Sequence, residues 1–187
     1  MTSRFVVLAV AVVLVASSCG GSKTTTQTVV KTTTVVRTVT TAPPAQSAAP
    51  CTGSDLSVTF KVQPGSAGAG NIVYTLALAN TSSSTCTFAG WPKLVFLAKD
   101  SSVLPTDVVP EPGSSAIDRQ LVTGGSISYD ARFSPDVPGT GDQQTGACQR
   151  TATAVRLAPP GGGTVDGPVS PPTSICEQGR ITLRPAA

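Results

Sequence analysis

The chain of 187 residues contains 13 lysines and arginines, 10 aspartates and glutamates, five cysteines and no histidine. Without histidine, the Ser-His-Asp and Cys-His arrangements of nucleophilic catalysis are excluded. The net charge of +3 is small and comes without a basic patch interleaved with aromatic residues, so we expect no nucleic-acid binding.

The N-terminal residues have the pattern of an export signal. Arg4 precedes an apolar run of 12 residues, 5–16, and two serines then lead to Cys19. A positive charge, a short apolar run and small residues before a cysteine are typical of a lipoprotein signal peptide, which we predict over residues 1–18. The run is too short to cross a hydrocarbon core of about 30 Å, which takes about 20 residues.

Cys19 is the predicted lipid attachment site. Five cysteines leave one unpaired in an exported protein, and diacylation of Cys19 would account for it. Lipoprotein signals prefer a larger aliphatic residue three positions before the cysteine, where this chain has Ala16, so secretion without a lipid stays open as an alternative. We expect the lipid on Cys19 to hold the protein on the outer face of the cell membrane.

Residues 19–50 are predicted to be a lipid-anchored, disordered linker rich in threonine, valine and proline. Ten of the 18 residues from Thr24 to Thr41 are threonine and five are valine, with no aromatic residue and no helical period. Such a segment cannot bury enough apolar surface to offset its ordering entropy. The threonine density suits O-glycosylation, and a plain spacer without sugar is the alternative. The linker carries +3, whereas residues 51–187, with nine basic and ten acidic residues, carry −1.

Alternating apolar and polar residues predict an all-β domain over residues 51–187. Leu56, Val58 and Phe60, for example, alternate with polar residues as in a half-buried strand. Clusters of Gly, Pro, Ser and Asp separate such segments at the spacing of a sandwich. We therefore predict an antiparallel, immunoglobulin-like β-sandwich of seven or eight strands. The predicted strands are 56–62, 72–80, 93–98, 127–133, 153–157 and 180–183, with weaker candidates at 103–104 and 119–122.

Four cysteines lie in this domain: Cys51, Cys86, Cys148 and Cys176. They include no C-x-x-C pair, and the chain has no histidine, so the spacing excludes a zinc ribbon. In an oxidising exterior they should form two disulfides, for which three pairings exist. We predict Cys51–Cys86, which would tie the start of the first strand to the end of the second. We also predict Cys148–Cys176, which would close a Pro- and Gly-rich loop over residues 159–172.

Short motifs accompany these cysteines. Asn80-Thr81 is followed by the segment Cys-Thr-Phe-Ala-Gly-Trp-Pro at residues 86–92, and the last two cysteines flank Pro159-Pro160. From Cys51 to Leu183 the sequence resembles the uncharacterised four-cysteine domain of actinobacterial lipoproteins and secreted proteins, domain of unknown function 4232. The resemblance implies a β-sandwich outside a Gram-positive cell and supplies no catalytic residues.

Other segments give little sign of chemistry. The carboxylates are scattered among loops and strand ends, so we interpret them as solvated surface charge, with an acid pair for hydrolysis as a minor alternative. The glycine run at 161–163 lacks the lysine and helix of a phosphate loop. Pro138 to Asp142 is interpreted as a plain loop, with calcium binding as its alternative. We expect no catalytic residue, no metal and no cofactor.

Trp91, the only tryptophan of the chain, is the one candidate interaction residue. It lies between two predicted strands, directly after a predicted disulfide. One interpretation packs it against that disulfide inside the sandwich. The other exposes it as an aromatic platform for a sugar ring or a partner protein.

These observations favour a non-enzymatic binding or interaction module of the cell envelope. We expect a monomer that is presented outside the membrane and has an envelope protein or a glycan as its partner. A structural or surface-spacer lipoprotein without a specific ligand is the alternative, and an envelope hydrolase is a minor one.

Overall fold

A computed structural model describes residues 48–186. The predicted signal peptide, Cys19 and most of the predicted linker therefore lie outside the described residues. Within residues 48–186, no helix is long and apolar enough to cross a membrane. This part of the chain forms ten strands and one short helical turn: β1 Leu56–Val62, β2 Ile72–Asn80, β3 Cys86–Gly90, β4 Lys93–Leu97, β5 Asp107–Pro110, β6 Ile117–Leu121, β7 Ser126–Phe133, β8 Ala152–Ala158, β9 Val165–Thr173, α1 Cys176–Gly179 and β10 Arg180–Pro185.

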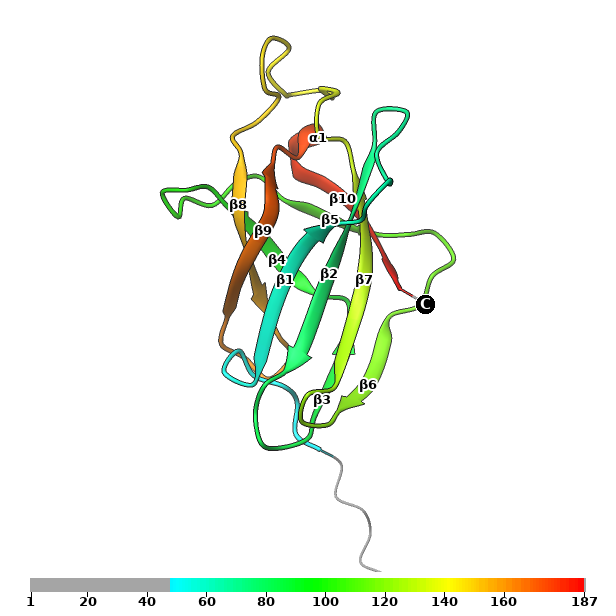
Figure 1. The fold of residues 1–187 in the computed structure, drawn as a ribbon, viewed down its shortest axis with the longest axis vertical. Helices are drawn as coiled ribbons and strands as arrows, with labels where there is room; N and C mark the ends of the chain where they lie inside the picture. The colour runs from blue at the N-terminus through cyan, green and yellow to red at the C-terminus, as the bar shows by residue number, and fades with distance from the viewer. Residues whose placement is uncertain (1–47, 187) are drawn as a thin grey trace, which may run out of the picture. The chain divides into compact units, whose positions relative to one another are not determined.

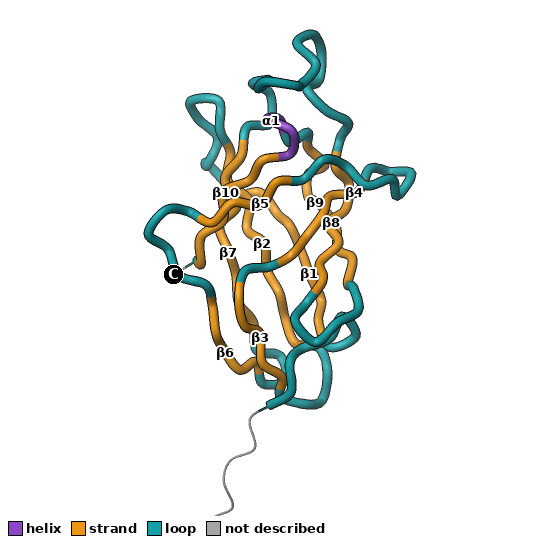
Figure 2. The backbone as a smooth tube through the Cα atoms, turned by 180° about the vertical axis from the view of Figure 1, so that it is seen from behind, coloured by secondary structure: helices purple, strands orange, loops and turns teal. Residues whose placement is uncertain are grey.

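Eight of these strands form one sheet in the order β4-β8-β9-β1-β2-β7-β10-β5, and β3 pairs with β6 in a separate two-stranded sheet. In Figure 1, β1, β2 and β7 lie side by side at the front, and Figure 2 shows β3, β4, β5 and β6 from behind. The large sheet curls so far that the rings of Phe60 on β1 and Phe96 on β4 have centroids 5.2 Å apart. The result is a sandwich with its core between β1, β2 and β7 on one side and β3, β4 and β6 on the other.

The core follows from the alternation of buried residues along the strands. In β2, Tyr74, Leu76 and Leu78 are buried while the residues between them are only partly so. The register of β2 with β7 sets Leu76 opposite Tyr129, so the inward side chains of neighbouring strands stack in rows. Burying these large apolar side chains supplies the main stabilisation, about 1.5–3 kcal/mol for each.

The all-β prediction is confirmed, and the six main predicted strands coincide with β1, β2, β4, β7, β8 and β10. The weaker candidate at 119–122 overlaps β6, whereas at 103–104 only Val103 pairs, in an isolated bridge to Leu97. Strands β3, β5 and β9 have no counterpart among the predicted ones, so the described chain has ten strands rather than seven or eight. Two strand pairs, β1 with β9 and β5 with β10, are parallel rather than antiparallel.

Strand β9 corrects the prediction of a loop over residues 159–172. Its three prolines argue against a strand because proline cannot donate a hydrogen bond to a ladder. The strand changes partner along its length: Val165 to Pro168 pair with β8, Val169 and Ser170 pair with β1, and Thr173 pairs again with β8. Gly167 permits this crossing, since a Cβ at that position would lie 1.9 Å from the carbonyl oxygen of Val58.

The turn α1 connects β9 to β10 in an unusual conformation. Glu177 and Gln178 have φ angles of 55° and 59°, in the left-handed region, which costs roughly 1–2 kcal/mol for each non-glycine residue. Gly179 follows, and a Cβ there would lie 1.9 Å from the carbonyl oxygen of Pro105. The turn therefore packs directly against the segment that enters β5, and other residues must stabilise its conformation.

Candidate functional site

A cleft of about 720 Å³ lies at the two edge strands of the large sheet, β4 and β5. We call it the Trp91 cleft. Trp91, Pro92 and Leu94 line it from the β4 side, and Val108 and Pro110 line it from β5. Pro159 and Pro160, which follow β8, add to the apolar lining. Among the described residues, Lys93 is the one charged side chain that lines the cleft.

Trp91 lies in the tight connection between β3 and β4. Its indole is partly buried against the core, and its ring centroid is 6.0 Å from that of Tyr129 on β7. The hydroxyl of Tyr129 donates a hydrogen bond of 3.2 Å to the carbonyl of Gly90, and burial raises the pKa of Tyr129 to about 12. Trp91 thus combines features of the buried and the exposed interpretation. Part of its ring packs on the core, and the residue also lines a cleft.

The two disulfides join the predicted pairs. Cys51 is bonded to Cys86 with a Cα–Cα distance of 4.9 Å, and Cys148 to Cys176 with 5.5 Å. The first links the chain just before β1 to the first residue of β3. The second joins the segment before β8 to the first residue of α1, so the two strands β8 and β9 lie between its cysteines.

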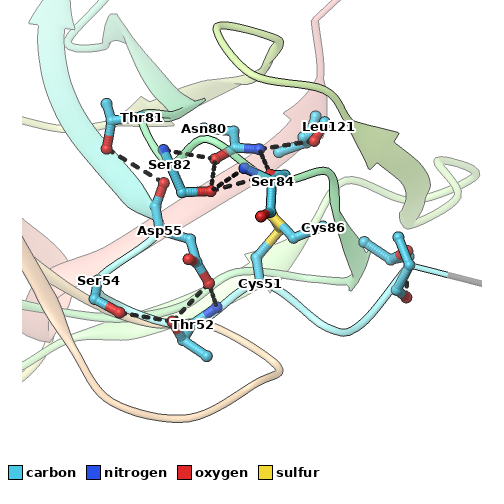
Figure 3. Close-up of a disulfide and its surroundings, with 12 residues drawn as sticks. Cys51, Thr52, Ser54, Asp55, Asn80, Thr81, Ser82, Ser84, Cys86 and Leu121 are labelled. Carbon is cyan, nitrogen blue, oxygen red and sulfur yellow. Dashed lines mark hydrogen bonds between the residues drawn. A yellow bond between two sulfur atoms is a disulfide. The ribbon is translucent and has the colours of Figure 1, made fainter.

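Asn80 holds the turn beside the Cys51–Cys86 disulfide (Figure 3). Its side chain is fully buried, and its Nδ2 donates hydrogen bonds of 2.7 and 2.8 Å to the carbonyls of Ser84 and Leu121. Its Oδ1 accepts from the backbone N–H and the hydroxyl of Ser82. It connects the end of β2 to β6, and because every polar atom of this amide has a partner, hydrogen bonds offset the cost of its desolvation. The Asn-Thr motif therefore begins with a structural residue.

Asp142 is a buried carboxylate whose role sequence reasoning missed. Its Oδ2 accepts from the backbone N–H groups of Gly139 and Glu177, and its Oδ1 accepts from the N–H and side-chain amide of Gln178 and from the side-chain amide of Gln149. Successive N–H groups in left-handed backbone form a concave anion site, and here Asp142 fills it. Burial raises the pKa of the carboxyl, but these donors outweigh it and lower the pKa to about 2.

The surroundings of Asp142 suit a structural role better than cation binding. One Asp142 oxygen and the sulfurs of Cys148 and Cys176 lie within 4.8 Å of one another. Both sulfurs are consumed in the disulfide, so neither is a thiolate ligand. The carboxylate faces five N–H donors, whose positive ends would repel a cation. The loop predicted at Pro138 to Asp142 is therefore an ordered element that fixes α1.

A second, polar groove crosses the outer face of β7 and β10. Two adjoining hollows of about 310 Å³ each share Asn71, Glu111, Arg132 and Thr182. Asp130, in the first hollow, accepts a hydrogen bond from the side chain of Gln63 and forms an ion pair of 2.9 Å with Arg184. This carboxylate therefore faces a guanidinium and an amide, which differs from the pair of facing carboxyls that glycoside hydrolysis requires.

A comparison with protein-family models gives one match for this chain. The model described as a domain of unknown function, DUF4232, matches residues 51–187. Neither the search of curated proteins nor that of solved structures gives a significant match.

Proposed function

The chain belongs to the DUF4232 family, whose description assigns no activity, and we propose that it is a non-enzymatic binding module of the cell envelope. Its ligand would occupy the Trp91 cleft, and a lipid on Cys19 would hold it at the outer face of the membrane. The observation that carries the proposal is an apolar cleft at the edge of the sheet with a partly buried tryptophan in its wall.

Two features support this proposal. Ligand sites are concave and mostly apolar, with a small number of polar groups that give specificity, and the Trp91 cleft combines apolar walls with a single lysine. Tryptophan is also among the residues that contribute most to binding energy. Two disulfides in 139 described residues suit an oxidising compartment, as does the export signal predicted at the N-terminus.

Replacing Trp91 with alanine should abolish ligand binding and lower stability only modestly. A partly buried tryptophan contributes less to folding than a core residue, so we expect a loss of about 1–2 kcal/mol in the free energy of unfolding. Trp91→Phe keeps an aromatic face and serves as the matched control.

Photo-crosslinking in living cells measures the binding. A benzoyl-phenylalanine introduced at Ala158, an exposed residue that lines the cleft, should form a specific adduct, which Trp91→Ala removes and Trp91→Phe keeps. The same probe at Val122, which is 60% exposed, serves as the positional control. Equal adducts from both positions, or adducts at Ala158 that survive Trp91→Ala, would favour a spacer without a specific ligand.

Replacing Cys19 with serine should release the protein from the membrane. A serine cannot carry the thioether-linked lipid, and two acyl chains are what make such an anchor stable. We expect the Cys19→Ser protein in the culture medium and a Ser18→Ala control in the membrane fraction, as measured by fractionation and immunoblot. Release of the unaltered protein as well would show that the chain is secreted without a lipid.

A further inference from the structure

We propose that the ligand of the Trp91 cleft is an extended peptide that inserts as a strand between β4 and β5. This inference rests on the proposed function and names its ligand class. It follows from how the two edges of the large sheet separate and from which backbone groups they turn toward the cleft.

The segment that follows β4 begins as its antiparallel partner and then leaves it. Leu97 bridges to Val103, and the N–H of Leu104 donates to the carbonyl of Phe96 at 2.9 Å. The last link is a hydrogen bond of 3.1 Å from the N–H of Phe96 to the hydroxyl of Thr106. Beyond Thr106 the chain becomes β5 and pairs with β10 instead. The two strands thus form a fork, and the Trp91 cleft is lined by both of its arms.

The β4 arm directs unpaired backbone groups toward the fork. Because both the N–H and the carbonyl of Phe96 bond to the 104–106 segment, they point away from β8. In an antiparallel pair the direction of these groups repeats at every second residue. The N–H and carbonyl of Leu94 therefore point the same way, into the cleft. Within residues 48–186, Leu94 has no hydrogen bond across the fork.

The β5 arm does the same from the other side. The N–H of Glu111 donates to the carbonyl of Leu183 on β10 at 2.7 Å. By the same alternation Val109 faces β10, and the N–H and carbonyl of Val108 face the fork. An extended peptide placed between the arms would bond to Leu94 on one side and to Val108 on the other. It would join the two edges of the sheet, as in strand addition by other peptide-binding domains.

The side chains of the cleft favour a peptide over a glycan. A sugar ring needs several convergent polar groups as well as an aromatic face, and among the described residues the polar side chains lining the cleft are Lys93 and Thr106. The Thr106 hydroxyl is already occupied, since it accepts from Phe96 and donates to the carbonyl of Leu104. Lys93 forms no ion pair within residues 48–186 and would bind a carboxylate. The matching peptide has alternating apolar side chains and an acidic residue.

The test uses the full chain carrying Cys19→Ser and a library of random twelve-residue peptides displayed on phage. Selected peptides should alternate apolar residues with at least one acidic residue, and should change the fluorescence of Trp91, the only tryptophan. N-methylation of any single central amide should lower affinity about tenfold, the effect of one hydrogen bond, because neighbouring amides donate to opposite arms. The amides of Leu94 and Val108 should gain protection from hydrogen exchange.

A matched pair of variants tests the β5 arm. Val108→Pro removes an N–H that faces the fork and should weaken peptide binding about tenfold, with the melting temperature nearly kept, since proline is tolerated on edge strands. Val108→Ile retains the N–H and should bind normally. If Val108→Pro unfolds, the hydrogen-exchange protection of Leu94 and Val108 decides instead.

The outcomes separate this inference from the proposed function. Strand insertion would be overturned, and the binding cleft kept, if the selected peptides bind equally well when N-methylated. The same conclusion would follow if the library yields no binder while an N-acetylglucosamine tetramer changes the fluorescence of Trp91. If neither probe binds and the crosslink from position 158 is independent of Trp91, both proposals fail.

Discussion

Loss of the Cys51–Cys86 disulfide should lower the free energy of unfolding by about 4 kcal/mol. The bond closes a loop with a sequence separation of 35, and the loss of loop entropy in the unfolded chain predicts an effect of this size. The native structure gives a further reason. Strand β3 pairs with β6 and is hydrogen-bonded to Ala49 and Cys51, and among the described residues its hydrogen bond to the large sheet is the one from the Tyr129 hydroxyl to Gly90. A two-stranded sheet is marginal by itself, so β3 depends on the disulfide and on burial of Phe88 and Leu121.

Urea unfolding of the Cys51→Ala/Cys86→Ala double variant measures this effect. The control keeps both cysteines, and Cys19→Ser is present in the control and in the double variant so that the predicted lipid is absent from each. Because β3 leads directly to Trp91, we also expect the tryptophan fluorescence to shift before the large sheet unfolds. A double variant within 1 kcal/mol of the control would contradict the loop-entropy account.

Replacing Asp142 with asparagine should destabilise the domain by about 3 kcal/mol. The substituted amide cannot accept five hydrogen bonds, and its NH₂ group would face the N–H donors of α1. Buried donors left without an acceptor cost about 1–3 kcal/mol each, although local relaxation recovers part of that. The left-handed conformation of Glu177 and Gln178 would lose the anion that stabilises it. Asp136→Asn, an exposed acid a few residues earlier, is the matched control.

The pH dependence of stability isolates the Asp142 carboxylate. Its pKa is lowered from 3.8 to about 2 in the folded protein, so the unfolded chain binds this proton more readily. The stabilisation is complete above pH 4 and is lost as the pH falls toward 2. We expect the wild type to lose stability over this range, and Asp142→Asn to lose less of it. Parallel acid unfolding curves for both proteins would refute the assignment.

The strands that sequence reasoning found are those whose pattern is local. β1, β2 and β7 alternate cleanly because one face is buried and the other is not. β9 was not predicted because its prolines argue against a strand. The strand accommodates these prolines because it changes its pairing partner along its length, which depends on the tertiary structure. β5 has only four residues, and its parallel pairing with β10 leaves no local signal.

The candidate site was predicted only in part. The sequence singled out Trp91 because it is unique, but the cleft beside it arises from the separation of β4 and β5 after Thr106, a nonlocal event. Asp142 resembled other loop acids because its five donors lie at residues 139, 149, 177 and 178. The cysteine pairs were predictable because four cysteines allow only three pairings, and the predicted export to an oxidising compartment favours all of them being bonded.

The position of the first disulfide has a mechanical consequence. Ala49 and Cys51 are hydrogen-bonded to Thr87, and Cys51 is bonded to Cys86, from which β3 runs to the connection that holds Trp91. A pulling force that enters the domain at Ala48 therefore reaches the wall of the cleft through covalent bonds: three residue steps to Cys51, one sulfur–sulfur link to Cys86 and five residue steps to Trp91. The large sheet lies outside this load path. Tension between the N-terminal side and a molecule bound at Trp91 would therefore be carried by covalent bonds rather than by the hydrogen bonds between strands. The sandwich would remain folded under a force that would separate strands held by hydrogen bonds alone.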